Sequence, residues 1–235
     1  MQQLGSAKAV LLDVDGTLYR QAPVRRRMVL EMVRFAFQSL SPLALVRLAR
    51  WIFYFRRARE RLRSAGRPSS SLDELQYAEP ARELGEEAGR LKDTVLEWML
   101  ERPLRHVGEA RREGVARFLK LLAARDIKAG AFSDYPVGDK LKALSLDDHF
   151  SVTLCATDCE INAFKPHPAG FLRACEIWDL DPSEVIYIGD RPEVDAAGAR
   201  AAGMPCFIIG ARNGDKGYCG IHSFNELCHA LENNR

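Results

Sequence analysis

The first residues that could do chemistry stand at the end of the first apolar run of the chain. This run, residues 9–14, contains Asp13 and continues into Asp15 and Gly16. A short apolar run stopped by Asp and Gly is typical of a buried parallel strand that enters a loop. In open α/β sheets, ligands bind outside the carboxyl ends of the strands. Asp13 and Asp15 are therefore candidates for a binding or catalytic site.

Three later apolar runs also lead to polar residues. Residues 128–132 lead to Ser133 and Asp134, residues 151–155 are followed by Lys165, and residues 185–188 lead to Asp190, with Glu193 and Asp195 beyond it. If these runs are parallel strands of one sheet, a hydroxyl, a lysine and several carboxylates converge on one crevice. Such a set of side chains suits magnesium and phosphate.

Helical and strand patterns alternate along the second half of the chain. The patterns predict helices over residues 109–125, 137–146, 169–178, 193–202 and 224–231. They predict a further strand over residues 205–209. This alternation implies a parallel sheet with helices on both faces. The predicted fold class is α/β, with a doubly wound, Rossmann-like parallel sheet.

A helical insertion separates the first strand from the rest of the predicted sheet. One face of a predicted helix is apolar and the opposite face is basic: Leu45, Leu48, Ile52, Phe55 and Leu62 against Arg47, Arg50, Arg57 and Arg61. We therefore divide the chain into an α/β core, residues 1–18 and 108–235, and an all-helical domain, residues 19–107.

The strand-end motifs, taken in order, resemble those of the haloacid dehalogenase superfamily, in particular its phosphatases with a helical cap inserted after the first motif. Asp13-Val14-Asp15-Gly16-Thr17-Leu18 matches the first motif, Phe132-Ser133 the second, Lys165-Pro166 the third, and Gly189-Asp190 with Asp195 the fourth. The resemblance covers essentially the whole core and implies that residues 19–107 form the cap.

The resemblance also implies roles for the strand-end residues in a Mg²⁺-dependent hydrolysis of a phosphate monoester. Asp13 would be the nucleophile that forms an aspartyl phosphate, and Asp15 would protonate the leaving oxygen and then activate water. Mg²⁺ would bind the Asp13 carboxylate, the Asp15 backbone carbonyl and Asp190. Ser133 and Lys165 would bind the phosphate. Asp15 itself favours an ester substrate, because dehalogenases and phosphonate hydrolases of this superfamily lack an acid there.

Charge counting favours the same cofactor and substrate. A phosphate dianion beside Asp13 and Asp190 brings four negative charges together, and each like-charge pair at about 4 Å costs about 4 kcal/mol at an effective dielectric constant of about 20. Mg²⁺ and Lys165 would together supply three positive charges. The expected cofactor is therefore Mg²⁺, and the expected partner is a small-molecule phosphate ester.

Three acidic residues have alternative interpretations. Many relatives have Asn where this chain has Asp134, and a carboxylate that faces phosphate would repel it. We place Asp134 in the phosphate-binding group, with a helix cap near Pro136 or a contact with a substrate hydroxyl as alternatives. Asp195 is expected to support the site from a second layer. Glu193 is either a solvated acid at a helix start or a contact of the metal site.

The charge of the chain is unevenly distributed. Residues 20–67 contain thirteen Arg, no Lys and two acids, a local net charge of +11; since the whole chain carries +2, the remainder carries −9. We expect this part of the cap to recognise an anionic substrate group, or an anionic membrane surface or lipid-linked substrate. A solvated or internally paired charged face is the alternative. No nucleic-acid partner is expected.

Composition excludes several other classes of protein. A chain of 235 residues that is 47% hydrophobic is not disordered, and its 17 Gly and 11 Pro do not fit a collagen-like chain. Six cysteines without a Cys-x-x-Cys pair, and no recognised signal peptide, predict a cytoplasmic protein, which the basic segment could place at the membrane periphery. Two other functions stay open: a phosphomutase of the same fold, and a membrane- or anion-binding module without catalysis.

Overall fold

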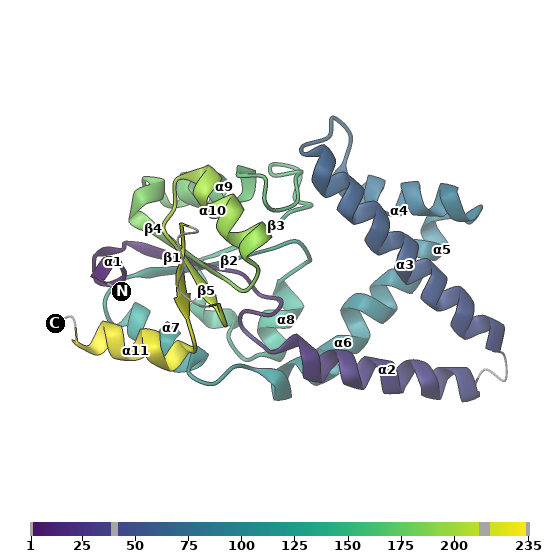
Figure 1. Cartoon of the computed structure of the whole chain (residues 1–235), viewed down its shortest axis with the longest axis horizontal. Helices are drawn as coiled ribbons and strands as arrows, with labels where there is room; N and C mark the ends of the chain where they lie inside the picture. Colours follow the sequence, from purple (N-terminus) through teal and green to yellow (C-terminus); the bar gives the residue numbers. More distant parts are fainter. Residues whose placement is uncertain (1, 39–41, 212–216, 234–235) are drawn as a thin grey trace.

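The centre of the molecule is a six-stranded parallel sheet with the strand order β3-β2-β1-β4-β5-β6 (Figure 1). The computed structural model describes residues 2–38, 42–211 and 217–233. The strands are β1 (Ala9–Leu12), β2 (Lys128–Ser133), β3 (Val152–Cys155), β4 (Val185–Gly189), β5 (Cys206–Ile209) and β6 (Cys219–Ile221). In sheets of this order a crevice opens at the carboxyl ends of β1 and β4, where the strand order reverses.

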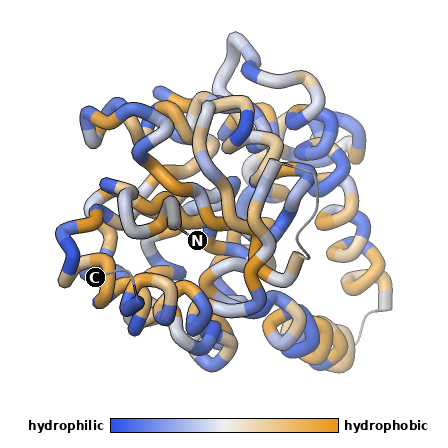
Figure 2. Tube along the Cα trace, turned by 60° about the vertical axis from the view of Figure 1, so that its left-hand side comes forward, coloured by the Kyte–Doolittle hydropathy of each residue, from blue (hydrophilic) through white to orange (hydrophobic). Residues whose placement is uncertain are grey.

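Helices cover both faces of the sheet. Val10 and Leu12 pack with one group of helices, α1 (Gln2–Ser6), α7 (Val115–Ala123), α8 (Gly138–Ala143) and α11 (Phe224–Asn233). Ala9 and Leu11 face the other way, toward α9 (Ala169–Trp178) and α10 (Ala197–Ala202). The central strands are apolar along their length because both of their faces are buried (Figure 2). The prediction of a doubly wound α/β fold is confirmed.

Short turns of helix complete the core. They are 3₁₀ helices at Gly108–Ala110, Asp147–His149 and Pro182–Glu184 and a π-helical turn at Pro192–Ala196. The sequence patterns identified five of the six strands but missed β6, because three residues that include a glycine are too few to show a strand period.

A group of helices between β1 and α7 stands to one side of the sheet (Figure 1). It consists of α2 (Gln21–Gln38), α3 (Pro42–Ala65), α4 (Leu72–Leu84), α5 (Ala88–Val95), the π-helical turn Leu96–Glu101 and α6 (Arg102–Val107). These helices have apolar clusters of their own, for example Trp51, Phe55 and Leu91. Val24 and Leu62 join the group to the clusters on the two faces of the sheet.

The two predicted faces of α3 differ in burial as expected. Leu48, Ile52, Phe55 and Leu62 are buried, whereas Arg47, Arg50 and Arg57 are exposed. Residues 39–41 of the basic segment lie outside the described part of the chain. Among the described helices, none combines the length and the apolar character that a transmembrane span requires.

Glu31 fastens α2 to α6. Its carboxylate lies 2.7 Å from His106 Nε2 and 3.3 Å from Arg102 Nη1. Burial alone would raise the pKa of Glu31, but the hydrogen bonds from His106 and Arg102 and their charges bring this pKa below its ordinary value. The ionised carboxylate is therefore the form that the fold stabilises.

Replacement of Glu31 by Gln should lower the free energy of unfolding at neutral pH by up to about 1 kcal/mol, the usual scale for a partly exposed ion pair. Because the folded-state pKa is lowered, this contribution is present above the ordinary pKa of Glu and is lost as the pH falls through the folded-state pKa. Thermal unfolding of wild type and Glu31→Gln across this range checks the prediction. A difference that stays constant as the pH falls would contradict it, and Glu109→Gln on an exposed site is the control.

Candidate active site

Asp13 stands at the carboxyl end of β1 with its carboxylate held on both oxygens. Lys165 Nζ lies 2.6 Å from Oδ1, and the Thr17 hydroxyl donates to Oδ2 at 2.9 Å. Burial raises the pKa of Asp13 to about 8; the Lys165 charge opposes this rise, whereas Asp195 and Asp190 add to it. The protein alone therefore stabilises a negative charge at Asp13 only weakly, and a further cation would favour it.

Lys165 is a buried ammonium group with three partners. Its Nζ donates to Asp13 Oδ1 at 2.6 Å, to Asp195 Oδ1 at 2.7 Å and to the Tyr187 hydroxyl at 3.0 Å. Burial disfavours its charge, but Asp13 and Asp195 together raise the pKa of Lys165 well above the ordinary value. Lys165 is therefore a fixed positive charge beside Asp13.

Asp195 has no oxygen left for another ligand. Its Oδ1 accepts hydrogen bonds from Lys165 and Tyr187, and its Oδ2 accepts from the backbone N–H groups of Asp190 at 3.1 Å and Arg191 at 3.0 Å. Burial would raise the pKa of Asp195, but Lys165 and these donors lower it. Asp195 thus orients both Lys165 and the backbone that carries Asp190.

Asp190 brings an unpartnered carboxylate oxygen to Asp13. Its Oδ1 is buried and has no hydrogen-bond partner among the described residues. Burial and the charge of Asp195 raise the pKa of Asp190 to about 6. Gly16, with φ +104°, allows the close approach, because a Cβ atom there would lie 2.1 Å from Asp190 Oδ2. An orphaned carboxylate oxygen at such a place fits a cation ligand.

The carboxylates around Asp13 fit a hard divalent cation. One oxygen each of Asp13, Asp190 and Asp195 lies within 4.8 Å of the others. Because Asp195 already accepts four hydrogen bonds from protein donors, Asp13 and Asp190 are the two carboxylates of this cluster that could hold a cation. The Asp15 backbone carbonyl, the third predicted ligand, accepts a hydrogen bond from Gln21 Nε2 at 2.6 Å and keeps its second lone pair.

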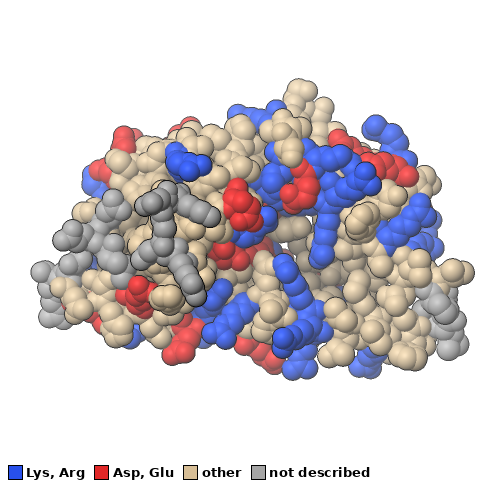
Figure 3. Space-filling view, in the orientation of Figure 1, with Lys and Arg blue, Asp and Glu red and all other residues tan. Residues whose placement is uncertain are grey.

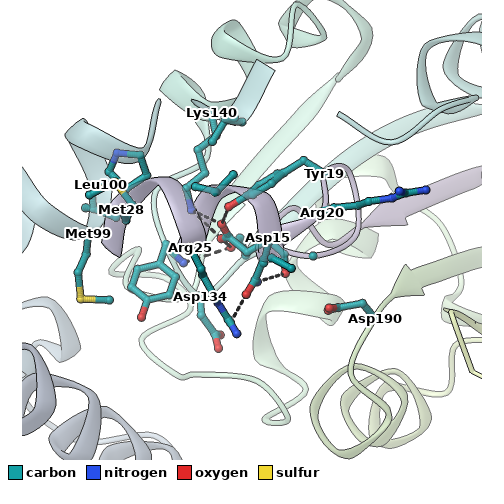
Figure 4. A pocket seen from close by; sticks show the side chains of 18 of the residues that line it. Asp15, Tyr19, Arg20, Arg25, Met28, Met99, Leu100, Asp134, Lys140 and Asp190 are labelled. Carbon is teal, nitrogen blue, oxygen red and sulfur yellow. Dashed lines mark hydrogen bonds and ion pairs between the residues drawn. The ribbon is translucent and has the colours of Figure 1, made fainter. Parts of the chain in front are cut away.

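Asp15 is bound by a lysine that the sequence analysis missed. Lys140 Nζ lies 2.7 Å and 2.6 Å from the two carboxylate oxygens, the Tyr19 hydroxyl donates at 2.5 Å, and Ser133 Oγ donates at 3.0 Å. Burial alone would raise the pKa of Asp15, but Lys140, Tyr19 and Ser133 bring it below the ordinary value. Figure 4 shows Lys140 and Tyr19 directed at Asp15. These contacts therefore favour the ionised form of Asp15, and the Ser133 hydroxyl is already used as a donor to Asp15.

Asp134 connects the core to α3 and does not cap a helix. Its Oδ1 accepts from the Lys165 backbone N–H at 3.1 Å, and its Oδ2 lies 2.8 Å from Arg63 Nη1. The helix-cap interpretation is wrong, because α8 begins at Gly138 after Val137 and has no side-chain cap. Both Asp134 oxygens already have donors, so its described contacts position Lys165 and do not supply a donor for phosphate.

A buried arginine of α3 holds the helices against these loops. Arg59 is only 3% exposed and lies between the rings of Tyr135 and Phe164, 4.0 Å and 4.1 Å from their centroids. It donates to the Asp134 carbonyl at 2.8 Å and to Gln76 Oε1. Arg63 adds a bond to the Lys165 carbonyl. Arg59 and Arg63, two of the thirteen arginines of the basic segment, thus belong to the junction with the core.

Three residues near Asp15 were not predicted from the sequence: Tyr19, Gln21 and Lys140. For two of them the sequence did carry a signal. Tyr19 and Gln21 follow the first motif closely, so their proximity to Asp15 was a usable signal. Lys140 lies on a short helix whose orientation no period revealed. Glu193, one of the open alternatives, is exposed and pairs with Arg191 at 3.0 Å, which fits a solvated acid.

A cavity of about 1160 Å³ lies between the core and the helices. The predicted residues Asp13, Asp15, Ser133, Lys165 and Asp190 line it, together with Asp134 and Asp195. Lys and Arg side chains gather around the hollow, with acidic side chains on its core side (Figure 3). The arrangement can bring an anion to two carboxylates, one fixed ammonium and a cation site.

Structures of similar fold cover almost the whole chain. A 2-haloacid dehalogenase from Pseudomonas syringae pv. Tomato DC3000 matches 97% of this chain and 99% of its own, with a TM-score of 0.66 and 22% identity. A β-phosphoglucomutase from Clostridium difficile matches 97% and 96%, with a TM-score of 0.63 and 17% identity. At such identities the likeness shows the fold alone.

Curated relatives match in shorter segments. Phosphoserine phosphatase of Thermus thermophilus is 33% identical over 96 residues, 41% of this chain and 34% of that protein. Phosphoglycolate phosphatase of Thiobacillus denitrificans is 38% identical over 69 residues, 29% of each chain. The chain thus covers about a third of these relatives. The sequence model of haloacid dehalogenase-like hydrolases, however, matches residues 7–203. The chain belongs to the haloacid dehalogenase-like hydrolase family.

Proposed function

We propose that the protein is a Mg²⁺-dependent phosphatase that hydrolyses a phosphate monoester through an aspartyl phosphate on Asp13. The helices of residues 19–107 would act as a cap that selects the substrate. One observation carries this proposal: a single cavity holds Asp13 against the Lys165 ammonium, an unpartnered Asp190 oxygen, and a second carboxylate, Asp15. Phosphatase activity among curated relatives supports the same reaction class.

The proposed reaction has two displacements at phosphorus. In the first, an Asp13 oxygen attacks phosphorus, the bond to the ester oxygen breaks, and the leaving oxygen takes a proton from Asp15. In the second, ionised Asp15 accepts a proton from water, the water oxygen attacks phosphorus, and the bond to Asp13 breaks. The products are the alcohol and inorganic phosphate, and Asp15 is again protonated.

Asp15 must exchange partners before it can act as an acid, because Lys140, Tyr19 and Ser133 favour its ionised form. A substrate phosphate would supply two changes. It would take the Ser133 hydroxyl from Asp15, and its negative charge would raise the pKa of Asp15.

Asp13, Asp190 and the Asp15 carbonyl would hold the metal ion. Bound there, Mg²⁺ would offset the repulsion between phosphate and Asp13 and polarise the phosphoryl group. Lys165 provides a second, permanent positive charge on Asp13. The chain itself thus positions the nucleophile. Because Lys165 and Asp13 are both buried, water is excluded from the contact between them.

Asp13→Asn should abolish phosphate release, because an amide cannot attack phosphorus, while unfolding stays cooperative. Purified wild type and variant would be screened against phosphate monoesters with Mg²⁺ for free phosphate. Asp179→Asn is a matched control, since Asp179 is an exposed residue with φ 54°, a conformation that Asn also tolerates. Wild-type phosphate release by Asp13→Asn would refute the proposed nucleophile.

Asp15→Ala should slow phosphoryl transfer from an alkyl phosphate far more than from p-nitrophenyl phosphate. General acid catalysis contributes about 10²- to 10⁴-fold when the leaving group needs a proton, and a nitrophenolate does not. Single-turnover kinetics would isolate the first step for both esters. An equal slowing of that step would show that Asp15 does not protonate the leaving group.

Asp190→Asn and Asp195→Asn should have different effects on metal binding and folding. Loss of a ligand carboxylate at Asp190 should weaken Mn²⁺ binding, measured by electron paramagnetic resonance, at least about tenfold. Asp195→Asn should mainly lower thermal stability, because it removes one of the two carboxylates that neutralise buried Lys165. Unchanged Mn²⁺ affinity in Asp190→Asn would reject the ligand assignment.

A further inference from the structure

The cavity has two chemically different ends. One end holds the carboxylates and Lys165 of the proposed reaction. The other is walled by apolar side chains of α2, α3 and the π-helical turn: Met28, Met32, Ile52, Trp98, Met99 and Leu100. Figure 4 shows Met28, Met99 and Leu100 together on one side of Asp15 and Asp190 on the other. A ligand that fills the cavity must therefore offer an apolar surface as well as phosphate.

Arginines without acidic partners also line the cavity. Arg25 and Arg56 form no ion pair with any described residue, and Arg25 donates a hydrogen bond to the side-chain amide oxygen of Gln21. Guanidinium groups bind carboxylates and phosphates through paired hydrogen bonds. Both residues are exposed to the solvent of the cavity mouth, so they are available to an anionic group of a ligand.

The size of the cavity also indicates a ligand larger than a small phosphate ester. Its 1160 Å³ exceeds the range of about 300–1,000 Å³ that encloses most drug-sized ligands. A phosphate ester of two or three carbons would fill only a small part of this volume and would leave most of the apolar wall in contact with water. Methionine-rich walls adapt to flexible apolar ligands, because the side chain is unbranched and polarizable.

We infer that the substrate is an amphiphilic phosphate monoester, whose leaving group has an apolar chain or ring against the Met28–Met99 wall and an anionic group near Arg25 and Arg56. This inference rests on the proposed function and specifies its substrate class. The phosphate sits at the carboxylate end, the anionic group at the arginines, and the apolar body along the cap.

A series of n-alkyl phosphates of increasing length tests the apolar part. Each buried methylene contributes enough to raise kcat/KM by about two- to fourfold until the wall is covered. Met28→Ser should flatten this slope, whereas Leu30→Ser, on the exposed side of the same helix, should keep it. ω-Carboxyalkyl phosphates should exceed the uncharged alkyl esters of equal length in wild type, and Arg56→Gln should remove that advantage.

The outcomes distinguish this inference from the proposed function. A rate that is flat or falls with chain length, with phosphate still released from short esters, would overturn the substrate class and leave the phosphatase assignment intact. No release from any ester would overturn both. The wild-type series needs no variant, so a misfolded Met28→Ser protein would not remove the test.

A second, independent observation concerns exposed side chains of α2 and α3, two helices that lie to the side of the molecule away from the sheet (Figure 1). Large apolar side chains are exposed there; Phe37 and Leu43 are each 78% exposed. We call the following residues the basic-apolar surface: Arg26, Arg27, Leu30, Val33, Arg34, Phe37, Leu43, Val46, Arg47, Arg50, Phe53 and Arg57. Its composition is unusual because every charged member is an arginine.

These arginines are not neutralised by the acidic core. None of the six forms an ion pair with a described residue, and Arg47 and Arg50 instead lie over the rings of Trp51 and Tyr54. The acids of α2 and α3 are engaged elsewhere: Glu31 with α6, and Glu60 with Arg63. The alternative that the basic face is internally paired is therefore limited to residues such as Arg59, Arg61 and Arg63.

We propose that the basic-apolar surface docks on an anionic lipid bilayer. Arginines are attracted to anionic headgroups, and exposed Phe and Leu side chains can enter the boundary between headgroups and acyl chains. A second copy of the chain is a poor occupant, because it would bring two sets of arginines together. Val29 is exposed beside this surface and also lines the cavity, so the cavity mouth adjoins the bilayer in this arrangement.

Sedimentation of the wild-type chain with vesicles tests the docking without any substrate. At low salt, vesicles containing phosphatidylserine should bind at least about tenfold more protein than pure phosphatidylcholine vesicles, and high salt should reduce the difference. Arg47→Glu/Arg50→Glu should lose the binding. Arg82→Glu/Arg90→Glu changes the net charge equally at exposed sites on α4 and α5 and should retain most of it.

Equal binding to the two kinds of vesicle, or equal loss in the two charge variants, would overturn the docking proposal. Self-association in analytical ultracentrifugation that Phe37→Ser abolishes would assign the surface to a second copy instead. Since none of these readouts involves turnover, their result is independent of the proposed reaction.

Discussion

The buried ammonium of Lys165 is the interaction on which the site depends. It lies 2.6 Å from Asp13 and 2.7 Å from Asp195, with almost no exposed surface. A charge in such a place is stable only when its partners are ionised and well oriented. Asp195 meets this requirement and, through its other oxygen, also sets the backbone at Asp190. One network therefore positions the proposed nucleophile, its counter-charge and the proposed metal ligand.

The same lysine connects the core to the helices. Its backbone N–H binds Asp134, whose second oxygen binds Arg63, and Arg59 fills the space beside it between two aromatic rings. Because this junction lies close to the reacting groups, a movement of α3 would also shift the loop that carries Lys165. Across the cavity, Lys140 pairs with Asp15, whereas Lys165 pairs with Asp13. Each of the two carboxylates therefore has its own cationic partner. Distinct environments for two carboxylates are the usual basis for distinct roles as nucleophile and acid.

Sequence predicted the sheet and the strand-end residues because parallel strands buried on both faces leave continuous apolar runs and must end in polar loops. It could not predict that Lys140 binds Asp15, since 125 residues separate them and only the packing of α8 brings them together. Nor could it separate Arg59 and Arg63 from their exposed neighbours, because all share one basic segment and only tertiary contacts distinguish them.

The central claim is that Asp13 carries the phosphoryl group between two displacements, and the stereochemical course at phosphorus tests it most directly. A phosphate ester made chiral at phosphorus with sulfur and oxygen isotopes would be hydrolysed in isotopically labelled water by the wild-type protein with Mg²⁺. Two in-line displacements predict net retention of configuration, even if the intermediate never accumulates. Net inversion would mean that water attacks the substrate directly and would contradict the account.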